Sequence, residues 1–108
     1  MKRGDLVLVA PAGEFGKPRP ALIIQSDAAF PSGNFTYLPI TSDLLRVPDI
    51  RVPVTPNPKN GLRQPSEIMV DMIQTSSLAR FGGIIGTIDA STLRSVESAL
   101  ALHVGLDQ

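Results

Sequence analysis

Short apolar runs alternate with proline and glycine along the whole of this 108-residue chain. Their length and their β-branched residues predict about six β-strands. Proline cannot donate a backbone hydrogen bond, so Pro39 predicts an edge or bulged position in the third run, and Pro53 predicts an edge position in the fourth. The predicted strands are Asp5–Ala10, Pro20–Ser26, Phe35–Ser42, Ile50–Thr55, Ser66–Gln74 and Gly82–Ile88.

The end of the chain has a helical period instead. Asp89 suits the N-cap of a helix that runs to about Val104, and Gly105 suits its stop. The apolar residues Leu93, Val96, Leu100 and Val104 recur every three or four positions, which predicts that one face packs on the sheet. Earlier in the chain, Asn60 and Gly61 predict a turn, because both tolerate a left-handed backbone.

These elements predict a mainly β fold. With 43% hydrophobic residues, the chain is expected to form a single domain, residues 1–108, around one core. Short strands with few long crossovers favour a small, strongly curved antiparallel sheet that closes on itself. The expected architecture is an SH3-like barrel with a C-terminal α-helix.

Composition excludes several kinds of site. The chain has no cysteine and one histidine, so thiolate sites and two-histidine acid–base catalysis are excluded, and a zinc site is not expected. His103 is expected to have a structural role near the helix end. Ten basic residues balance ten acidic ones, so any polyanion site must be a local cluster. The apolar stretch near the start is too short for a signal segment or a membrane span, which predicts a cytoplasmic protein without a membrane partner.

The first chemically suggestive stretch is "GEFGKPRPALIIQSD", residues 13 to 27. Pro18 and Pro20 restrict the backbone on both sides of Arg19, so its guanidinium starts from a stiff strand end. Two glycines would allow the loop to bring Glu14 beside it, and Lys17 adds a second positive charge. The simpler interpretation is an exposed turn in which Glu14 and Arg19 form a weak surface ion pair.

Five segments stand in a recognisable order along the chain: "RGDLVLV", "KPRPALIIQSD", "LPITS", "GLRQPSEIMVD" and "IGTIDASTLRSVESALALHVGL". Together they resemble the MazF/PemK family of toxin endoribonucleases. The resemblance implies a dimeric SH3-like barrel that cleaves single-stranded RNA at short sequences, with mRNA as the expected substrate. It also implies inhibition by a cognate antitoxin and no requirement for a metal or other cofactor. The first loop is shorter than in many members, and Met72 follows Asp71 where many members have glutamine.

By the same resemblance, the catalytic residues fall on Arg19, Thr41 and Glu14. These residue types suit cleavage by the neighbouring 2'-hydroxyl. Arginine offers a forked donor to phosphate oxygens, and a threonine hydroxyl can hold the same phosphate. A carboxylate such as Glu14 can accept the 2'-hydroxyl proton.

Further RNA contacts are expected from polar and basic residues around this site, with structural alternatives for several of them. Ser42 could bind phosphate or cap a short turn, and Asp71 could approach the groove or be a hydrogen-bonded strand carboxylate. The arginines could line a groove or be scattered surface charges. The candidate RNA-binding residues are Lys17, Phe15, Ser42, Arg46, Arg51, Arg63, Ser66 and Asp71.

Two other functions remain as alternatives. A CcdB-like gyrase-poisoning toxin shares the expected fold, but it acts through a C-terminal Trp-Gly-Ile ending that this sequence lacks. A non-catalytic SH3-like binding module would need an aromatic-lined groove, and this chain is poor in aromatic residues.

Overall fold

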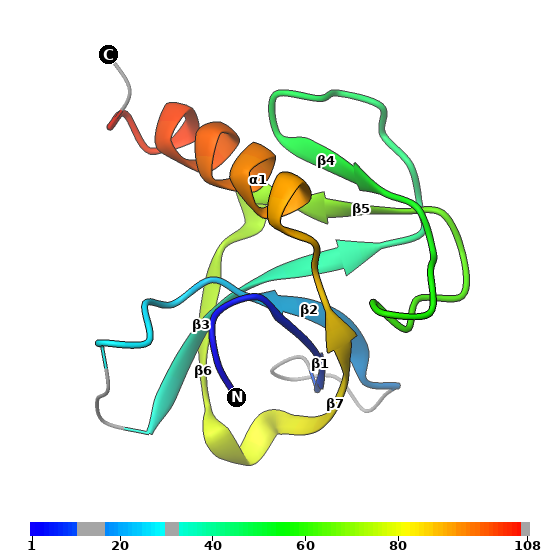
Figure 1. Cartoon of the computed structure of the whole chain (residues 1–108). Coiled ribbons are helices and arrows are strands. Elements are labelled where there is room, and N and C mark those ends of the chain that lie inside the picture. Colours follow the sequence, from blue (N-terminus) through cyan, green and yellow to red (C-terminus); the bar gives the residue numbers. More distant parts are fainter. Residues whose placement is uncertain (11–16, 30–32, 107–108) are drawn as a thin grey trace.

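The computed structural model describes residues 1–10, 17–29 and 33–106. Within these ranges, seven strands, two short 3₁₀-helices and one α-helix follow one another (Figure 1). They are β1 (Asp5–Val9), β2 (Arg19–Ile23), β3 (Asn34–Thr41), β4 (Arg51–Val54), β5 (Ser66–Met69), η1 (Val70–Met72), β6 (Gln74–Ser77), η2 (Leu78–Arg80), β7 (Phe81–Thr87) and α1 (Ala90–His103).

The strands form one antiparallel sheet in the order β4-β5-β3-β2-β1-β7, with β6 paired to β3. The mainly β fold with a C-terminal helix is therefore confirmed. Closure differs from the prediction, because no pairing joins β4 to β7 among the described residues. Instead, the turn after β4 rests on β7, where the Thr87 amide donates to the Lys59 carbonyl at 2.9 Å.

Strand β3 lies inside the sheet, so of the two positions predicted for Pro39, edge or bulged, the edge position is wrong. On one side β3 pairs with β2, where Pro39 faces Ala21. On the other side its first half pairs with β6, up to Tyr37, and its end pairs with β5 from Ile40 onward. Pro39 therefore lies where the partner strand changes, at a point where no ladder hydrogen bond is required of it. Pro53, in contrast, lies in β4 at the end of the sheet, as predicted.

The predicted strand Ser66–Gln74 is too long. Its chain leaves the sheet after Met69, makes the single turn η1, and returns as β6. The polar sequence of β6, Gln-Thr-Ser-Ser, carries no apolar alternation, and this strand is absent from the sequence prediction. Polar pairs hold it to β3, including Thr36 and Thr75, whose hydroxyl oxygens lie 2.8 Å apart.

The alternation of side chains along the strands builds an apolar cluster on each face of the sheet. Under α1, Leu6, Leu22, Leu38 and Ile68 are completely buried, together with Val96 of the helix. On the other face, Val7, Val9, Ala21 and Ile23 pack with Tyr37. The Phe81 ring meets Tyr37 and Phe35 edge to face there, at centroid distances of 5.5 and 5.8 Å.

Helix α1 begins and ends near the predicted residues. The Asp89 carboxylate accepts from the Thr92 amide at 3.0 Å, and Gly105 has a left-handed φ of 79°. Leu93 and Leu100 pack on the core, but Val104 is exposed, because it is the C-cap and no longer follows the helical stripe. No described helix is long and apolar enough to cross a membrane.

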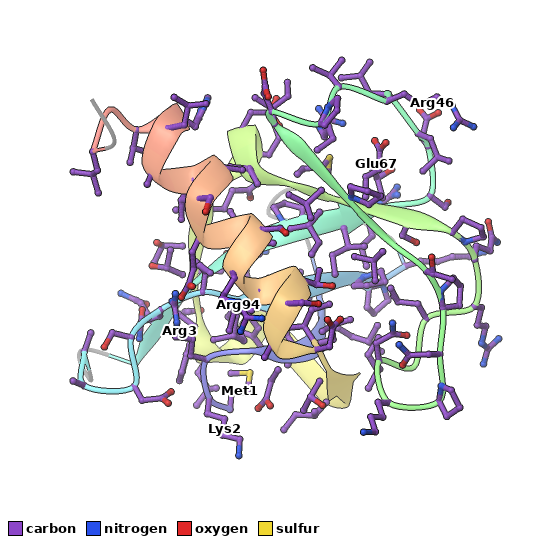
Figure 2. All side chains as sticks on the ribbon, turned by 45° about the horizontal axis from the view of Figure 1, so that its top comes forward. Met1, Lys2, Arg3, Arg46, Glu67 and Arg94 are labelled. Carbon is purple, nitrogen blue, oxygen red and sulfur yellow. The ribbon has the colours of Figure 1, made fainter. Side chains whose placement is uncertain are left out.

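Arg3 connects the N-terminal segment to this helix (Figure 2). Its guanidinium donates to the Ile24 carbonyl and forms an ion pair with Glu97 of α1 at 2.5 Å. The backbone amide of the same residue donates to Asp27. The helix is therefore fixed to the sheet by polar contacts as well as by its apolar face.

Candidate functional site

A cavity of about 460 Å³ opens beside the ends of β2 and β3. Its lining combines apolar residues with two arginines, three hydroxyl groups and one carboxylate. Five of the predicted site residues line it together: Arg19, Thr41, Ser42, Arg63 and Ser66. The other lining residues are Leu8, Pro20, Ile40, Asp43, Gly61, Leu62, Gln64 and Ile85.

Arg19 is the first residue of β2 and pairs with Val9 of β1. Its side chain is exposed, and no hydrogen bond or ion pair joins its guanidinium to another described residue. The strand pairing and the flanking prolines fix the backbone, while the charged group faces the cavity and the solvent. Such a guanidinium is available to bind an anion.

Thr41 is the last residue of β3 and lies opposite Glu67 of β5. Its Oγ1 accepts a hydrogen bond from the Asp43 amide at 3.0 Å. Because that contact occupies a lone pair of the oxygen, the hydroxyl hydrogen remains available as a donor. Thr41 and Arg19 line the same cavity, to which one brings a hydroxyl donor and the other a guanidinium.

The opposite wall of the cavity is formed by the turn that rests on β7. The buried Asn60 holds this turn: its side-chain oxygen accepts from the amides of Asn57 and Leu62, and its nitrogen donates to Thr55. The next residue, Gly61, has a φ of 71°, as the predicted turn requires. The sequence predicts Asn60 only as a turn residue; the structure shows in addition that it is buried next to Gly61, which lines the cavity.

Two of the predicted RNA-binding residues extend from this wall. Arg63 is exposed, and no contact to another described side chain competes for it. Ser66 is buried, and its hydroxyl donates to the Gln64 carbonyl at 2.8 Å. Ser66 therefore shapes the wall, whereas Arg63 offers a second positive charge to a ligand in the cavity.

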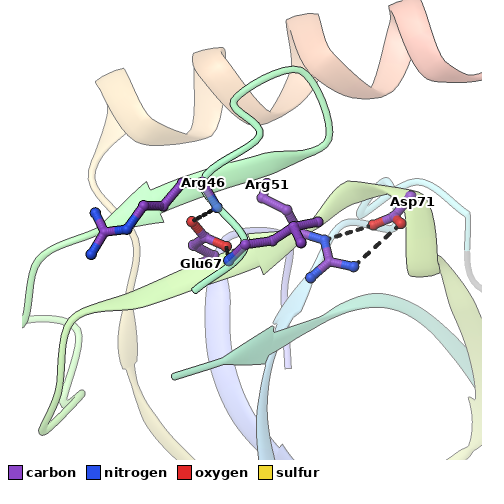
Figure 3. Close-up of polar contacts among 5 residues, drawn as sticks. Arg46, Arg51, Glu67 and Asp71 are labelled. Atoms are coloured by element: carbon purple, nitrogen blue, oxygen red, sulfur yellow. Dashed lines mark hydrogen bonds and ion pairs between the residues drawn. The ribbon is translucent and has the colours of Figure 1, made fainter. Parts of the chain in front are cut away.

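Arg51 and Asp71 lie outside the cavity and bind each other (Figure 3). The Nε of Arg51 lies 3.0 Å from one carboxylate oxygen of Asp71, and a second guanidinium nitrogen lies 3.4 Å from the other oxygen. The hydrogen bond from Arg51 holds the pKa of Asp71 below its ordinary value. The structural alternative for Asp71, a hydrogen-bonded carboxylate, thus describes its local contacts, and a role of this pair in RNA binding stays a prediction.

Glu67 is a buried carboxylate that the sequence analysis did not single out. Its two oxygens accept from the amides of Leu45, at 2.8 Å, and Arg46, at 3.1 Å (Figure 3). Arg46 has a φ of 64°, a left-handed conformation, while its side chain is exposed. The only sequence signal for Glu67 is a charged residue within an apolar strand.

The remaining predictions concern Lys17, Glu14, Phe15 and His103. Lys17 is exposed just before β2 and does not line the cavity. Glu14 and Phe15 lie outside the described residues. His103 is exposed in the last turn of α1. Within the described ranges, no group of three His, Cys, Asp or Glu residues could hold a metal ion.

The cavity as a whole suits a phosphate-containing ligand. Two arginines and a threonine hydroxyl can contact anionic oxygens, and the apolar lining residues can accept a flat or aliphatic group. Among the charged lining residues, only Asp43 is negative. The site can therefore bind an anion of intermediate size and stabilise added negative charge on it.

Comparison with known proteins identifies relatives over nearly the whole chain. A family model described as PemK-like, MazF-like toxin of type II toxin-antitoxin system matches residues 2–104. The chain is 31% identical over 107 residues to a probable endoribonuclease MazF of Mycolicibacterium smegmatis, with 98% of each protein covered.

Solved structures agree with this match. The Mycobacterium tuberculosis toxin MazF-mt6 superposes with a TM-score of 0.80 at 30% identity, over 96% of this chain and 99% of that one. An endoribonuclease in complex with its cognate antitoxin, from a mycobacterial species, has a TM-score of 0.84 at 21% identity, over 100% and 98% of the two chains, and supports the fold. The chain belongs to the PemK-like, MazF-like toxin family of type II toxin-antitoxin systems.

Proposed function

We propose that this toxin is an endoribonuclease that cleaves single-stranded RNA, with the scissile phosphate bound between Arg19 and Thr41. The observation that carries the proposal is that these two residues, one with an exposed guanidinium and one with an available hydroxyl donor, line the same cavity. Relatives named as endoribonucleases support the reaction class. The gyrase-poisoning and non-catalytic alternatives have no comparable support.

In the proposed reaction, the 2'-oxygen attacks the adjacent phosphorus and the bond to the 5'-oxygen breaks. The 2'-hydroxyl proton leaves to a base, for which Glu14 is the candidate, and the departing 5'-oxygen takes up a proton from solvent water. The products are a 2',3'-cyclic phosphate and a 5'-hydroxyl end. Arg19 stabilises the charge that builds on the phosphoryl oxygens, and Thr41 donates to one of them.

Binding of the RNA strand extends beyond the reacting phosphate. Arg63 and Ser42 line the same cavity and are proposed to contact the neighbouring nucleotides. The proposed mechanism needs no metal, because the substrate supplies the nucleophile and the chain supplies the positive charge. The predicted homodimer, the cognate antitoxin as inhibitor and action in the cytoplasm belong to this same proposal.

The test is cleavage of an RNA oligonucleotide by the purified protein in excess EDTA. We expect cleavage with a cyclic phosphate end, and none when the scissile nucleotide lacks its 2'-hydroxyl. Arg19→Ala should slow cleavage by about 10²–10³-fold, the usual loss for one electrostatic donor. Arg19→Lys should restore little, because lysine lacks the planar fork.

The matched control is Arg94→Ala, which removes an exposed arginine from α1, away from the cavity. It should cleave at the rate of the unmodified protein. Activity that requires added magnesium, or full activity of Arg19→Ala, would contradict the proposed mechanism.

A further inference from the structure

Glu67 is the most deeply buried charged side chain beside the candidate site, with 4% of its surface exposed. No basic side chain pairs with it among the described residues. A buried carboxylate is costly unless it is hydrogen-bonded, and here both oxygens are used by consecutive backbone amides of the segment that follows β3. The carboxylate therefore fixes a loop rather than neutralising a cation.

The residue held in this way has an unusual backbone. Arg46 is the one non-glycine residue with a positive φ in the described ranges. Arginine gains nothing from this conformation, for which glycine or asparagine would be suited. A costly buried charge thus maintains a strained backbone at one arginine, and strain of this kind is typical of functional positions.

The consequence of the strain is the direction of the Arg46 side chain. In Figure 3 its guanidinium extends away from the Glu67 carboxylate and from the Arg51–Asp71 pair. It is exposed and forms no ion pair with a described residue. Its loop begins after Thr41, which pairs with Glu67 of the neighbouring strand β5. The loop then continues through Ser42 and Asp43, which line the cavity.

We propose that Glu67 is a positioning residue that holds Arg46 as a phosphate contact for the RNA strand beyond the cavity. The inference rests on the proposed function and extends it to a second arginine on the Thr41 side. Glu67 itself does not contact the RNA. It acts through the Leu45 and Arg46 amides, which set the backbone from which the guanidinium projects.

The experiment measures binding of an RNA oligonucleotide that lacks the scissile 2'-hydroxyl, by fluorescence anisotropy over a range of salt concentrations. Arg46→Gly should raise the melting temperature, because glycine accepts the left-handed backbone without strain. The same variant should weaken RNA binding on the order of tenfold, as expected for one lost charge-assisted contact. The slope of log affinity against log salt should fall by about 0.7, the value for one phosphate on a single strand.

Glu67→Gln tests the positioning role. Removal of a negative charge near an RNA site should by simple electrostatics tighten binding. We expect the opposite, weaker binding with a smaller salt slope, because glutamine offers one acceptor to two amides and the loop loses its fixed backbone. In the Arg46→Gly background, Glu67→Gln should no longer weaken RNA binding.

Glu97→Gln is the matched control, since it removes a carboxylate from α1 without contact to this loop. It should bind RNA as tightly as the unmodified protein, or more tightly. Unchanged affinity and salt slope in Arg46→Gly would overturn the inference, as would an equal loss from Glu67→Gln with and without Arg46. If the unmodified protein neither binds nor cleaves RNA, the proposed function itself fails.

Discussion

Gly86 allows the backbone of β7 to touch the turn that forms the cavity wall. A Cβ atom at this position would lie 2.3 Å from the Lys59 carbonyl oxygen and 2.5 Å from the carbonyl carbon of Asn60. Ordinary contacts of this kind are about 3.5 Å, so Gly86→Ala must displace the turn by about 1 Å. Overpacking of this kind costs about 1–3 kcal/mol, and loss of the Thr87–Lys59 hydrogen bond adds about 0.5–1.5 kcal/mol.

The expected loss of unfolding free energy is therefore about 2–4 kcal/mol. For a domain of this size, such a loss lowers the melting temperature by about 10–20 °C. Urea denaturation followed by circular dichroism measures the free energy, and a thermal melt provides an independent check. RNA affinity at a temperature well below the transition should also fall, because Gly61 and the residues after it line the cavity.

Gly83→Ala is the matched control in the same strand. Apart from its two chain neighbours, no described residue has an atom within 4 Å of a Cβ at Gly83, and its φ is outside the left-handed region. This variant should have the stability of the unmodified protein or gain up to about 1 kcal/mol, because alanine reduces the freedom of the unfolded chain. Equal stability of the two alanine variants would refute the argument that the turn closes against β7.

Three further predictions concern single polar contacts. Asp89→Ala should cost about 1 kcal/mol at pH 7, because the N-cap of α1 is lost. Hydrogen bonds from Ser91 and Thr92 hold the pKa of Asp89 below its ordinary value, so this stability is present above about pH 4 and is lost on further acidification. Thermal melts of the variant and the unmodified protein at pH 7 and pH 3 measure the difference. A double-mutant cycle of Arg51→Ala and Asp71→Ala should give a coupling free energy of about 1 kcal/mol at pH 7. Because Arg51 lowers the pKa of Asp71, this coupling should shrink as the pH falls below the ordinary pKa range of the carboxyl group. Additive losses of stability in the two single variants would contradict the prediction. Asn60→Asp should cost about 2–3 kcal/mol in urea denaturation, since the donor to the Thr55 carbonyl is replaced by an acceptor; a stable variant would show that this contact is dispensable.

Much of the fold follows from local sequence signals. Residues close together in the sequence are enough to predict five of the strands, the Asp89 cap, the Asn60–Gly61 turn and the helix stop at Gly105. The structure contains all of these features. Strand β6 was not predictable in this way, because its polar residues form a strand only through pairing with β3. The same is true of Pro39, since the exchange of partner strands depends on residues about 30 positions away.

The site divides along similar lines. The residue types at Arg19 and Thr41 were selected from the sequence through the family resemblance, and the sheet brings both to one cavity. The Arg51–Asp71 contact depends on the β4–β5 pairing, in which Arg51 faces Met69, and a pattern in one strand cannot reveal it. The burial of Glu67 likewise depends on the course of the loop after β3, for which the local sequence contains no direct signal.

The exchange of partners at Pro39 also restricts how the chain can misfold. A one-residue slip of β3 against its neighbours would bring a residue without an amide hydrogen to a position that needs a donor, and would turn Leu38 and Ile40 away from the core. Thr41 lies two residues further on, so the same slip would turn its hydroxyl to the other face of the sheet. The proline therefore penalises incorrect register in the strand that carries Thr41, the proposed hydrogen-bond donor to phosphate. A chain that folds stably then also has this hydroxyl on the side of the cavity.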